Sequence, residues 1–443
     1  MTKIIVIGAN HAGTACVNTI LDNFPGTEVV VYDRNNNISF LGCGMALWIG
    51  GQISGSDGLF YCSKDILESK GAKINMESEV LNLDENKKEV EVRLSNGEII
   101  KDNYDKLILA TGSRARCSNV PGEDLENIKV AKLFQDAKAV KELMDDESIK
   151  DTVVLGSGYI GVELVEAFAR IGKNVTLITR SPRILRGNFD EDIAKPIADL
   201  LEENGVTIRT NENLVRYEGK ERVEKVVTDK GEYPADLVIN SIGFEPNAFL
   251  GDSLKRHCSG AYEVNKKFET SNKDIYAIGD CATNYNNASG KTDYIALATN
   301  AVRSGIVAAV NACGGDLESA GVQGSSGMSI YDYKVVMTGL TTDQAAKEGI
   351  EIKENVIEDL QMPEFMEVPN EKVRLKVIYR ADNRKIVGAQ MGSFHDMSMG
   401  IHLFSLAIER GVTIDELALT DVFFMPHFNK PYNYITMAAL TAE

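Results

Sequence analysis

Residues 151–161, with the sequence DTVVLGSGYIG, run from an apolar strand into a turn that contains three glycines. Helical periodicity follows over residues 162–171, and residues 174–178 predict the next strand. Gly156, Gly158 and Gly161 have the spacing of a dinucleotide-binding turn: the first makes the turn, the second admits a pyrophosphate and the third lets helix and strand pack closely. We predict a nucleotide at the helix N-terminus, where unpaired N–H groups favour an anion; the alternative is a tight turn without a ligand.

A second copy of this pattern begins the chain. Lys3–Ile7 is an apolar strand, residues 8–13 form a glycine-punctuated turn, and residues 14–24 predict a helix. Asn10 occupies the place of the middle glycine, and asparagine tolerates unusual backbone angles. Asp33 ends the second strand, 20 residues past the last glycine of the turn, where a carboxylate can bind a ribose 2′-hydroxyl. We expect a bound adenine dinucleotide, unless Asp33 only caps a loop.

The two patterns also end alike. Residues 104–112 and 235–243 each place an acidic residue before an apolar strand that stops at a glycine. Hairpin signals at residues 95–97 and 229–231 predict an antiparallel meander within each half. The sequence therefore predicts an α/β fold with two Rossmann-like dinucleotide-binding domains.

The last part of the chain carries no glycine fingerprint and indicates a separate α+β domain that begins near residue 320. We expect strands at residues 334–338, 373–379 and 385–391, and helices at residues 398–410 and 432–440.

Composition excludes several classes of protein. Asp and Glu number 65 against 47 Lys and Arg, so the net charge of −18 disfavours nucleic acids and anionic membrane surfaces as partners. No apolar run approaches the ~18 residues that span a bilayer, and the N-terminus enters a strand at once, which leaves no room for a signal peptide. The 7 cysteines are scattered without C-x-x-C spacing, which argues against disulfides or a structural metal site. We expect a cytoplasmic protein without a metal.

A third signal lies at residues 270–280, where an apolar strand ends in Gly279-Asp280. A carboxylate at a strand end, beside two dinucleotide folds, points to a flavin whose ribityl hydroxyls bind Asp280. With these motifs the chain resembles the pyridine nucleotide-disulfide oxidoreductases, a superfamily with a glutathione reductase-like fold. The resemblance implies an FAD-binding domain at 1–112 and 248–320, an NAD(P)H-binding domain at 113–247 and a C-terminal interface domain at 321–443. It also implies a homodimer, with the loop Phe424–Lys430 near the partner's flavin.

Cys43 lies in the segment SFLGCGM at residues 39–45. Its flanking glycines permit close packing on a flat cofactor, and a place at the start of a helix would lower its pKa. A disulfide reductase carries a second cysteine five residues on, where this chain has Trp48. We therefore expect a single cysteine that cycles between thiolate and sulfenic acid; a buried structural cysteine is the alternative.

His11, in the first glycine turn, accompanies this segment. Together SFLGCG and G-x-x-H-x-G resemble the branch of NADH peroxidases and water-forming NADH oxidases, which implies that His11 and Cys43 form a peroxide-reducing site. Peroxidases of this branch carry arginine directly after Asn-Ala in a helix motif, whereas Val302 follows Asn300-Ala301 here and Arg303 comes next. That pattern resembles the oxidases.

The resemblance implies a set of cofactor-binding residues drawn from the two glycine turns, the strand ends and the flavin motifs. They are Gly8, Asn10, His11, Ala12, Gly13, Asp33, Cys43, Thr111, Gly112, Ser113, Lys132, Gly156, Gly158, Tyr159, Ile160, Gly161, Glu163, Thr179, Arg180, Gly243, Gly279, Asp280, Leu297, Ala298 and Thr299.

The second fold departs from the family at the end of its second strand. An acidic residue is expected there for the NADH ribose, but the chain has Thr179 followed by Arg180. Nothing there repels a 2′-phosphate, and Arg180 could bind one, so NADPH is possible although the rest of the chain favours NADH.

We therefore expect an FAD-dependent oxidase that uses NADH to reduce O₂ to water, with peroxide bound on the way. The nearest alternatives are an NADH peroxidase and a coenzyme A-disulfide reductase. An electron-transfer reductase for a small redox protein and a non-enzymatic nucleotide-binding redox sensor are alternatives from other classes.

Overall fold

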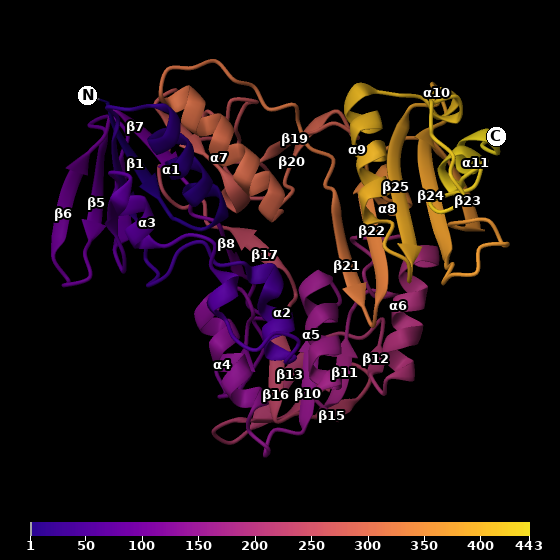
Figure 1. The fold of residues 1–443 in the computed structure, drawn as a ribbon. Helices are drawn as coiled ribbons and strands as arrows, with labels where there is room; N and C mark the ends of the chain where they lie inside the picture. The colour runs from indigo at the N-terminus through magenta and orange to yellow at the C-terminus, as the bar shows by residue number, and fades with distance from the viewer. Residues whose placement is uncertain (1) are drawn as a thin grey trace.

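The computed structural model describes residues 2–443 and contains three five-stranded sheets in three lobes of the molecule (Figure 1). Two of the sheets are parallel and the third is antiparallel. This architecture confirms the predicted fold class. The boundaries proposed for the domains stay predictions, and each sheet is described below with the elements that pack on it.

The first sheet has the order β18-β7-β1-β2-β3. Its strands are β1 (Lys3–Ile7), β2 (Glu28–Tyr32), β3 (Lys73–Asn75), β7 (Lys106–Leu109) and β18 (Ile275–Ala277). β1 lies in the centre and is buried along its length apart from Lys3, as its apolar sequence requires. Helices α1 (His11–Asn23), α3 (Lys64–Ser69) and α7 (Ala298–Ala312) accompany this sheet, and α7 lies beside α1 in Figure 1.

Helix α1 begins three residues earlier than the sequence indicated. The N–H of Thr14 donates to the carbonyl of Asn10 (2.8 Å), which closes the first turn over His11 and Gly13. The glycine is therefore inside the helix, where it brings the helix against the turn. His11 lies in the first helical turn rather than in the glycine loop, which corrects its predicted position.

The second sheet repeats the first, with the order β12-β11-β10-β16-β9. Its strands are β9 (Ile128–Lys129), β10 (Asp151–Leu155), β11 (Asn174–Ile178), β12 (Thr207–Arg209) and β16 (Leu237–Asn240), and its helices are α4 (Phe134–Met144), α5 (Tyr159–Arg170) and α6 (Glu191–Glu203). In each sheet the glycine turn follows the central strand, β1 or β10, and the neighbouring strand, β2 or β11, ends beside it.

Antiparallel meanders are present in both halves, as predicted. They consist of β4 (Glu79–Asp84), β5 (Glu89–Arg93) and β6 (Ile99–Asn103) in the first half, and β13 (Leu214–Gly219), β14 (Val223–Thr228) and β15 (Glu232–Pro234) in the second. Two short pairs complete the connections: β8 (Ser113–Ala115) with β17 (Phe244–Pro246), and β19 (Asn284–Asn286) with β20 (Lys291–Asp293).

The third sheet is antiparallel, with the order β21-β22-β25-β24-β23. Its strands are β21 (Ser326–Ile330), β22 (Tyr333–Gly339), β23 (Ile352–Leu360), β24 (Lys372–Arg380) and β25 (Ile386–Ser393); its helices are α8 (Thr342–Lys347), α9 (Ile401–Arg410), α10 (Ile414–Ala418) and α11 (Tyr434–Leu440). The predicted strands and helices of this region are confirmed, whereas β21, β23, α8 and α10 were not predicted. β21 is rich in serine and glycine and β23 has mixed polarity, so neither shows a clear apolar pattern.

One apolar core joins parts of all three lobes. It contains Ile49 from helix α2 (Met45–Ile49), Phe168 from α5 and Val335 from β22. α2 follows Cys43 directly and packs so closely on α5 that a Cβ added at Gly50 would lie 3.0 Å from the Cα of Ala167. The segment that carries Cys43 is thereby held against α5, the helix that follows the second glycine turn.

A buried polar cluster also joins the second sheet's helices to the third sheet. Asp190, which precedes α6, accepts hydrogen bonds from the side chain of Gln390 (2.8 Å) and from the Thr342 hydroxyl (2.9 Å). The ammonium of Lys376 lies 3.2 Å from Asp190 and 2.8 Å from Glu354. Both Asp190 and Lys376 are 6% exposed, so this contact is sheltered from water.

Candidate active site

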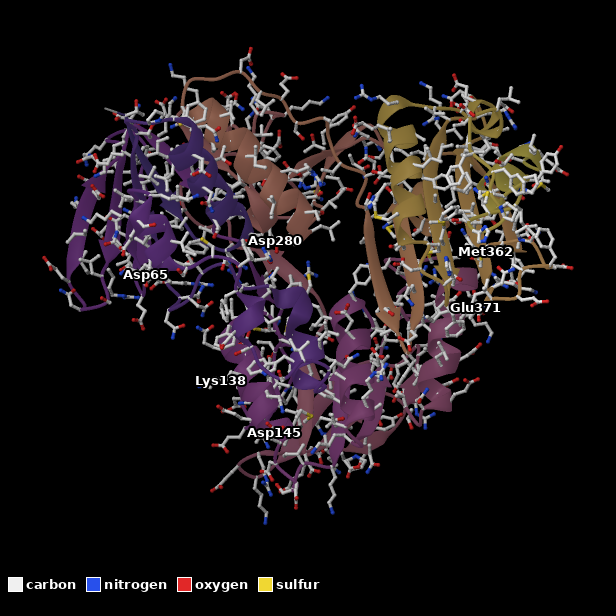
Figure 2. The ribbon with its side chains drawn as sticks, in the orientation of Figure 1. Asp65, Lys138, Asp145, Asp280, Met362 and Glu371 are labelled. Atoms are coloured by element: carbon white, nitrogen blue, oxygen red, sulfur yellow. The ribbon has the colours of Figure 1, made fainter. Side chains whose placement is uncertain are left out.

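A cavity of about 720 Å³ lies where the two parallel-sheet lobes and β21 meet. Figure 2 shows Asp280, one of its wall residues, near the centre of the molecule. Most of the residues predicted from the sequence line this cavity: Gly8, Asn10, His11, Ala12, Asp33, Cys43, Thr111, Gly112, Ser113, Lys132, Gly158, Tyr159, Ile160, Gly161, Glu163, Gly243, Gly279, Asp280, Leu297, Ala298 and Thr299.

Gly13, Gly156, Thr179 and Arg180 do not line the cavity. The two glycines serve close packing, Gly13 within its own turn and Gly156 against the residue that follows β16. A Cβ at Gly13 would lie 1.9 Å from the carbonyl oxygen of Gly8, and one at Gly156 would lie 2.4 Å from that of Ser241. Thr179 is buried at the end of β11, and Arg180 is exposed outside the cavity.

The N-termini of α1 and α5 have the features of phosphate-binding sites. Asn10 and Gly158 precede these helices, neither gives a side-chain cap, and neither helix has an acidic residue in its first turn. The first N–H groups are therefore left for another acceptor. A Cβ built on Gly158 would meet nothing within 4 Å, so the second turn opens onto free space. Both turns fit the pyrophosphate of a dinucleotide.

Asp33 ends β2 beside the first turn. Its carboxylate is 5% exposed and accepts hydrogen bonds from the backbone N–H groups of Ala9 (2.7 Å) and Asn35 (2.8 Å). Burial raises the pKa of Asp33, although these hydrogen bonds oppose the shift. Asp33 thus organises the loop and also faces the cavity, so the two interpretations offered by the sequence are compatible.

Asp280 lies in a short 3₁₀ segment, Gly279–Cys281, and forms the charged centre of the cavity wall. Its carboxylate accepts hydrogen bonds from Ser113 (2.8 Å) and Lys132 (3.0 Å). Burial alone would raise the pKa of Asp280, but the charge and hydrogen bond of Lys132, aided by Ser113, lower it overall. Asp280 is therefore a carboxylate at neutral pH, able to accept hydrogen bonds from a polyol chain.

Cys43 lies in another 3₁₀ segment, Gly42–Gly44, with its side chain exposed in the cavity. Burial raises the pKa of its thiol, the carboxylate of Glu163 raises it further, and Lys132 opposes both. The expectation that a helix N-terminus lowers this pKa is therefore wrong. The regular helix α2 starts only at Met45 and has five residues, so its dipole is small beside these effects.

Glu163 and His11 are the other titratable groups of this wall. Burial, followed by the charge of Glu166, raises the pKa of Glu163 to about 7, so this carboxyl changes charge near neutral pH. Burial lowers the pKa of His11, Asp280 opposes the shift and Lys132 adds to it. The imidazole is therefore neutral at pH 7 and can accept or donate a proton.

Two partners of the site residues were not predicted. The Nδ1 atom of His11 lies 3.0 Å from the hydroxyl of Tyr61, and the two rings stack with their centroids 5.7 Å apart. Tyr159, which begins α5, shares a hydrogen bond of 2.7 Å with Ser326 of β21. Tyr61 belongs to no recognisable motif, and the sequence does not indicate a contact between Tyr159 and Ser326.

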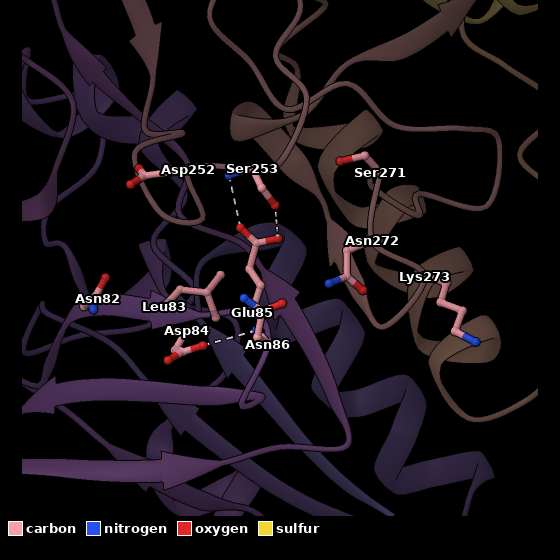
Figure 3. A pocket seen from close by; sticks show the side chains of 10 residues that line it. All are labelled: Asn82, Leu83, Asp84, Glu85, Asn86, Asp252, Ser253, Ser271, Asn272 and Lys273. Atoms are coloured by element: carbon pink, nitrogen blue, oxygen red, sulfur yellow. Dashed lines mark hydrogen bonds between the residues drawn. The ribbon is translucent and has the colours of Figure 1, made fainter.

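A second cavity of about 810 Å³ lies beside the first meander, between residues 82–86, 252–253 and 271–273 (Figure 3). Its walls are mostly polar. Glu85 spans it by accepting hydrogen bonds from the Ser253 backbone N–H (3.2 Å) and hydroxyl (2.6 Å). No cysteine, histidine or glycine turn lines it, so it lacks the groups found in the first cavity.

Comparison with protein-family models gives two matches. Residues 2–305 match the model described as pyridine nucleotide-disulphide oxidoreductase, and residues 326–433 match the dimerisation domain of the same family. The chain belongs to the pyridine nucleotide-disulphide oxidoreductase family. Membership implies a flavin and a pyridine nucleotide as the redox partners, and the dimerisation domain suggests an oligomer. None of the helices within residues 2–443 is long and apolar enough to cross a membrane.

Relatives in this family match the chain along its whole length. An NADH oxidase from Streptococcus pyogenes is 52% identical over 456 residues, which cover 100% of both chains. The structure of a water-forming NADH oxidase from Lactobacillus brevis, bound to NADH, has a TM-score of 0.96 at 36% identity and covers 99% of this chain and 98% of its own.

An engineered variant of the Lactobacillus brevis enzyme, a water-forming NADPH oxidase bound to NADPH, also has a TM-score of 0.96, at 37% identity and with coverage of 99% and 97%. It carries five substitutions, the first of a glycine by alanine. The other four are counted from that glycine. They replace an aspartate by alanine 18 positions later, an alanine by arginine 19 positions later, a methionine by serine 20 positions later and a proline by arginine 25 positions later. At the same spacing after Gly161, this chain has Thr179, Arg180, Ser181 and Arg186.

Proposed function

We propose that the chain is an FAD-containing NADH oxidase that reduces O₂ to water with four electrons and uses Cys43 as its single redox-active cysteine. The family match and the full-length similarity to NADH oxidases support this activity. The observation that carries the proposal is that Cys43, His11 and Asp280 share one cavity with both glycine turns, and that no other cysteine lines it.

In this proposal residues 1–112 and 248–320 hold FAD, residues 113–247 hold the pyridine nucleotide, and residues 321–443 pair two copies of the chain. Large apolar side chains are exposed in the last of these regions, which supports a pairing surface there. They include Phe365, Val368, Leu419, Phe423, Phe424, Met425, Phe428 and Tyr432. The loop Phe424–Lys430 would then approach the partner's flavin.

The flavin, when bound, supplies the transfer of electron pairs from NADH to oxygen. The glycine turns and uncapped helices hold the phosphates of the two dinucleotides. Asp280, kept charged by Lys132, accepts hydrogen bonds from the ribityl hydroxyls. These residues orient the reactants and exclude water, so the first electron pair reduces O₂ to peroxide within the cavity.

Cys43 and His11 then reduce the peroxide. The Cys43 thiolate attacks one peroxide oxygen, the O–O bond breaks, and the second oxygen leaves as water once it has been protonated. The neutral imidazole of His11 can take the thiol proton and return it to the leaving oxygen. The resulting sulfenic acid accepts the second electron pair and protons, which releases the second water and restores the thiol. Two NADH are consumed for each O₂.

The stoichiometry of Cys43→Ser tests this proposal. Serine is essentially never ionised near neutral pH and has no sulfenic acid state, so peroxide would leave unreduced. We expect the wild type to use two NADH per O₂ without H₂O₂ release, and Cys43→Ser to use one NADH per O₂ and release one H₂O₂. His11→Gln should release an intermediate amount. Cys117→Ser removes an exposed cysteine outside the cavity and is the matched control.

The same oxygen-electrode experiment separates the alternatives. An NADH peroxidase would oxidise NADH only when H₂O₂ is added, and a coenzyme A-disulfide reductase only with that disulfide. A redox sensor would turn over none of these substrates, and an electron-transfer reductase would not depend on Cys43. If Cys43→Ser still forms water, the proposed role of this cysteine is wrong.

A further inference from the structure

The ends of β2 and β11 are equivalent positions in the two parallel sheets. The Asp33 N–H donates to the carbonyl of Asn75 (2.9 Å) on the next strand, β3, and the Thr179 N–H donates to that of Arg209 (2.8 Å) on β12. In a Rossmann fold this position faces the adenosine ribose of the bound dinucleotide. The chain thus carries a carboxylate where FAD presents a ribose diol, but a neutral hydroxyl where the pyridine nucleotide would present its ribose.

The side chain of Thr179 is held within the fold. Its hydroxyl lies 3.0 Å from that of Ser157 and accepts a hydrogen bond of 3.2 Å from the Ser181 N–H. Glu212 donates its backbone N–H to the Thr179 carbonyl (3.1 Å). The Glu212 carboxylate is directed elsewhere, since it accepts hydrogen bonds from Thr228 and from Tyr233 (2.7 Å). The Glu212 carboxylate therefore does not replace the missing carboxylate at the end of β11.

Three arginines follow Thr179 in the sequence: Arg180, Arg183 and Arg186. Arg183 and Arg186 lie 3.9 and 2.9 Å from a single carboxylate, that of Asp343 in α8. Arg180 is exposed and forms no ion pair within residues 2–443. The chain has a net charge of −18, but residues 180–186 form a local cluster of positive charge in which the guanidinium of Arg180 has no ion-pair partner within residues 2–443. Such a group binds a phosphate through charge-assisted hydrogen bonds.

We infer that the second glycine fold accepts a 2′-phosphate on the adenosine ribose, so that NADPH serves as a reductant beside NADH. The inference rests on the proposed oxidase function and names a further substrate for the same site. Arg180 would bind the 2′-phosphate, and Thr179 admits it because a carboxylate there would repel it. The engineered relative that holds NADPH carries arginine, serine and arginine at the spacing of Arg180, Ser181 and Arg186.

Binding without turnover gives the first test. Purified holoenzyme is titrated calorimetrically with adenosine 2′,5′-bisphosphate and with 5′-AMP, which differ only in the 2′-phosphate. We expect the bisphosphate to bind at least tenfold more tightly, and Arg180→Ala to remove most of that difference without weakening 5′-AMP. Arg410→Ala, on the exposed end of α9, removes the same charge elsewhere and should change neither affinity. Equal binding of the two ligands by the wild type would overturn the inference.

Kinetics with O₂ give the second test. The wild-type kcat/KM for NADPH should be at least one tenth of that for NADH. Arg180→Ala and Thr179→Asp should each lower the ratio of kcat/KM for NADPH to kcat/KM for NADH at least tenfold. A wild-type ratio below one tenth would contradict the inference and leave the oxidase proposal intact. If neither nucleotide supports O₂ consumption while the bisphosphate still binds preferentially, the oxidase proposal fails and the 2′-phosphate site stands.

Discussion

Replacement of Lys376 by methionine tests how strongly the buried polar cluster holds the third sheet against α6. The Lys376 ammonium lies 3.2 Å from Asp190, 2.8 Å from Glu354 and 3.6 Å from Asp192, with 6% of its side chain exposed. Methionine has a similar length but no charge. In Lys376→Met the Asp190 carboxylate would keep only the neutral donors of Gln390 and Thr342.

The expected loss follows from burial. Removing one partner of a buried ion pair leaves an uncompensated charge and typically costs about 3–5 kcal/mol. Lys372 lies on the same strand and pairs with Glu358 at 3.4 Å, but it is 65% exposed. Exposed pairs contribute about 0–1 kcal/mol, so Lys372→Met is a matched control. We expect Lys376→Met to lower the free energy of unfolding by about 3–5 kcal/mol and Lys372→Met by less than 1 kcal/mol.

Urea unfolding followed by circular dichroism and by the fluorescence of Trp48, the chain's single tryptophan, measures both variants. Adding Asp190→Asn to Lys376→Met should recover part of the loss, because the stranded carboxylate is then removed. The pKa of Lys376 is raised: burial opposes this, but the hydrogen bond to Glu354 and the charges of Asp190 and Asp192 outweigh it. Its contribution is therefore complete below the unfolded pKa of about 10.4 and is lost as pH rises through the folded pKa. Equal losses in Lys376→Met and Lys372→Met would refute the reasoning.

Three further outcomes are expected. The purified protein should be yellow and release FAD on denaturation, because the proposed function assigns an adenine dinucleotide to the first fold; chromatography that finds FMN or no flavin would contradict this assignment. The rate of peroxide reduction should rise with pH above neutrality, because burial and Glu163 raise the pKa of Cys43. Glu163→Gln should shift this pH profile to lower pH, whereas an unchanged or upward-shifted profile would exclude an effect of Glu163 on the thiol. Phe424→Glu should give a monomer in sedimentation, since Phe424 is 48% exposed in the proposed pairing surface, and a variant that stays dimeric would place the interface elsewhere.

The sequence predicts the parts of the structure that depend on neighbouring residues. The strand Lys3–Ile7 is buried and apolar, and the structure has the same bounds. The close contacts of Gly13 with Gly8 and of Gly161 with Gly156 follow from short-range geometry. The sequence could not show the contact of His11 with Tyr61, because only the tertiary fold brings residues 11 and 61 together.

The sequence also could not show which residues are buried or which charged residues from distant parts of the chain lie near them. Lys376, within the sequence KVRLKVIYR, has the spacing of a solvent-facing residue, but its ammonium lies against Asp190 and Asp192 at the start of α6 and is part of a buried cluster. The pKa of Cys43 was predicted with the wrong sign because burial raises it, and the charge of Glu163, from the second fold, raises it further. In both cases a residue from another lobe contributes to the environment.

The closing strand of the first sheet has a consequence for synthesis on the ribosome. β18 pairs with β7 but is translated after every strand of the second sheet. As the nascent chain emerges, the second lobe can therefore complete its sheet first. The edge of β7 stays unpaired until residues 275–277 have been synthesised. Asp280 and α7 emerge later still, so the part of the cavity wall that they form is completed only after the second lobe has been synthesised. Slow codons or a pause before residue 275 would prolong the exposure of that open edge.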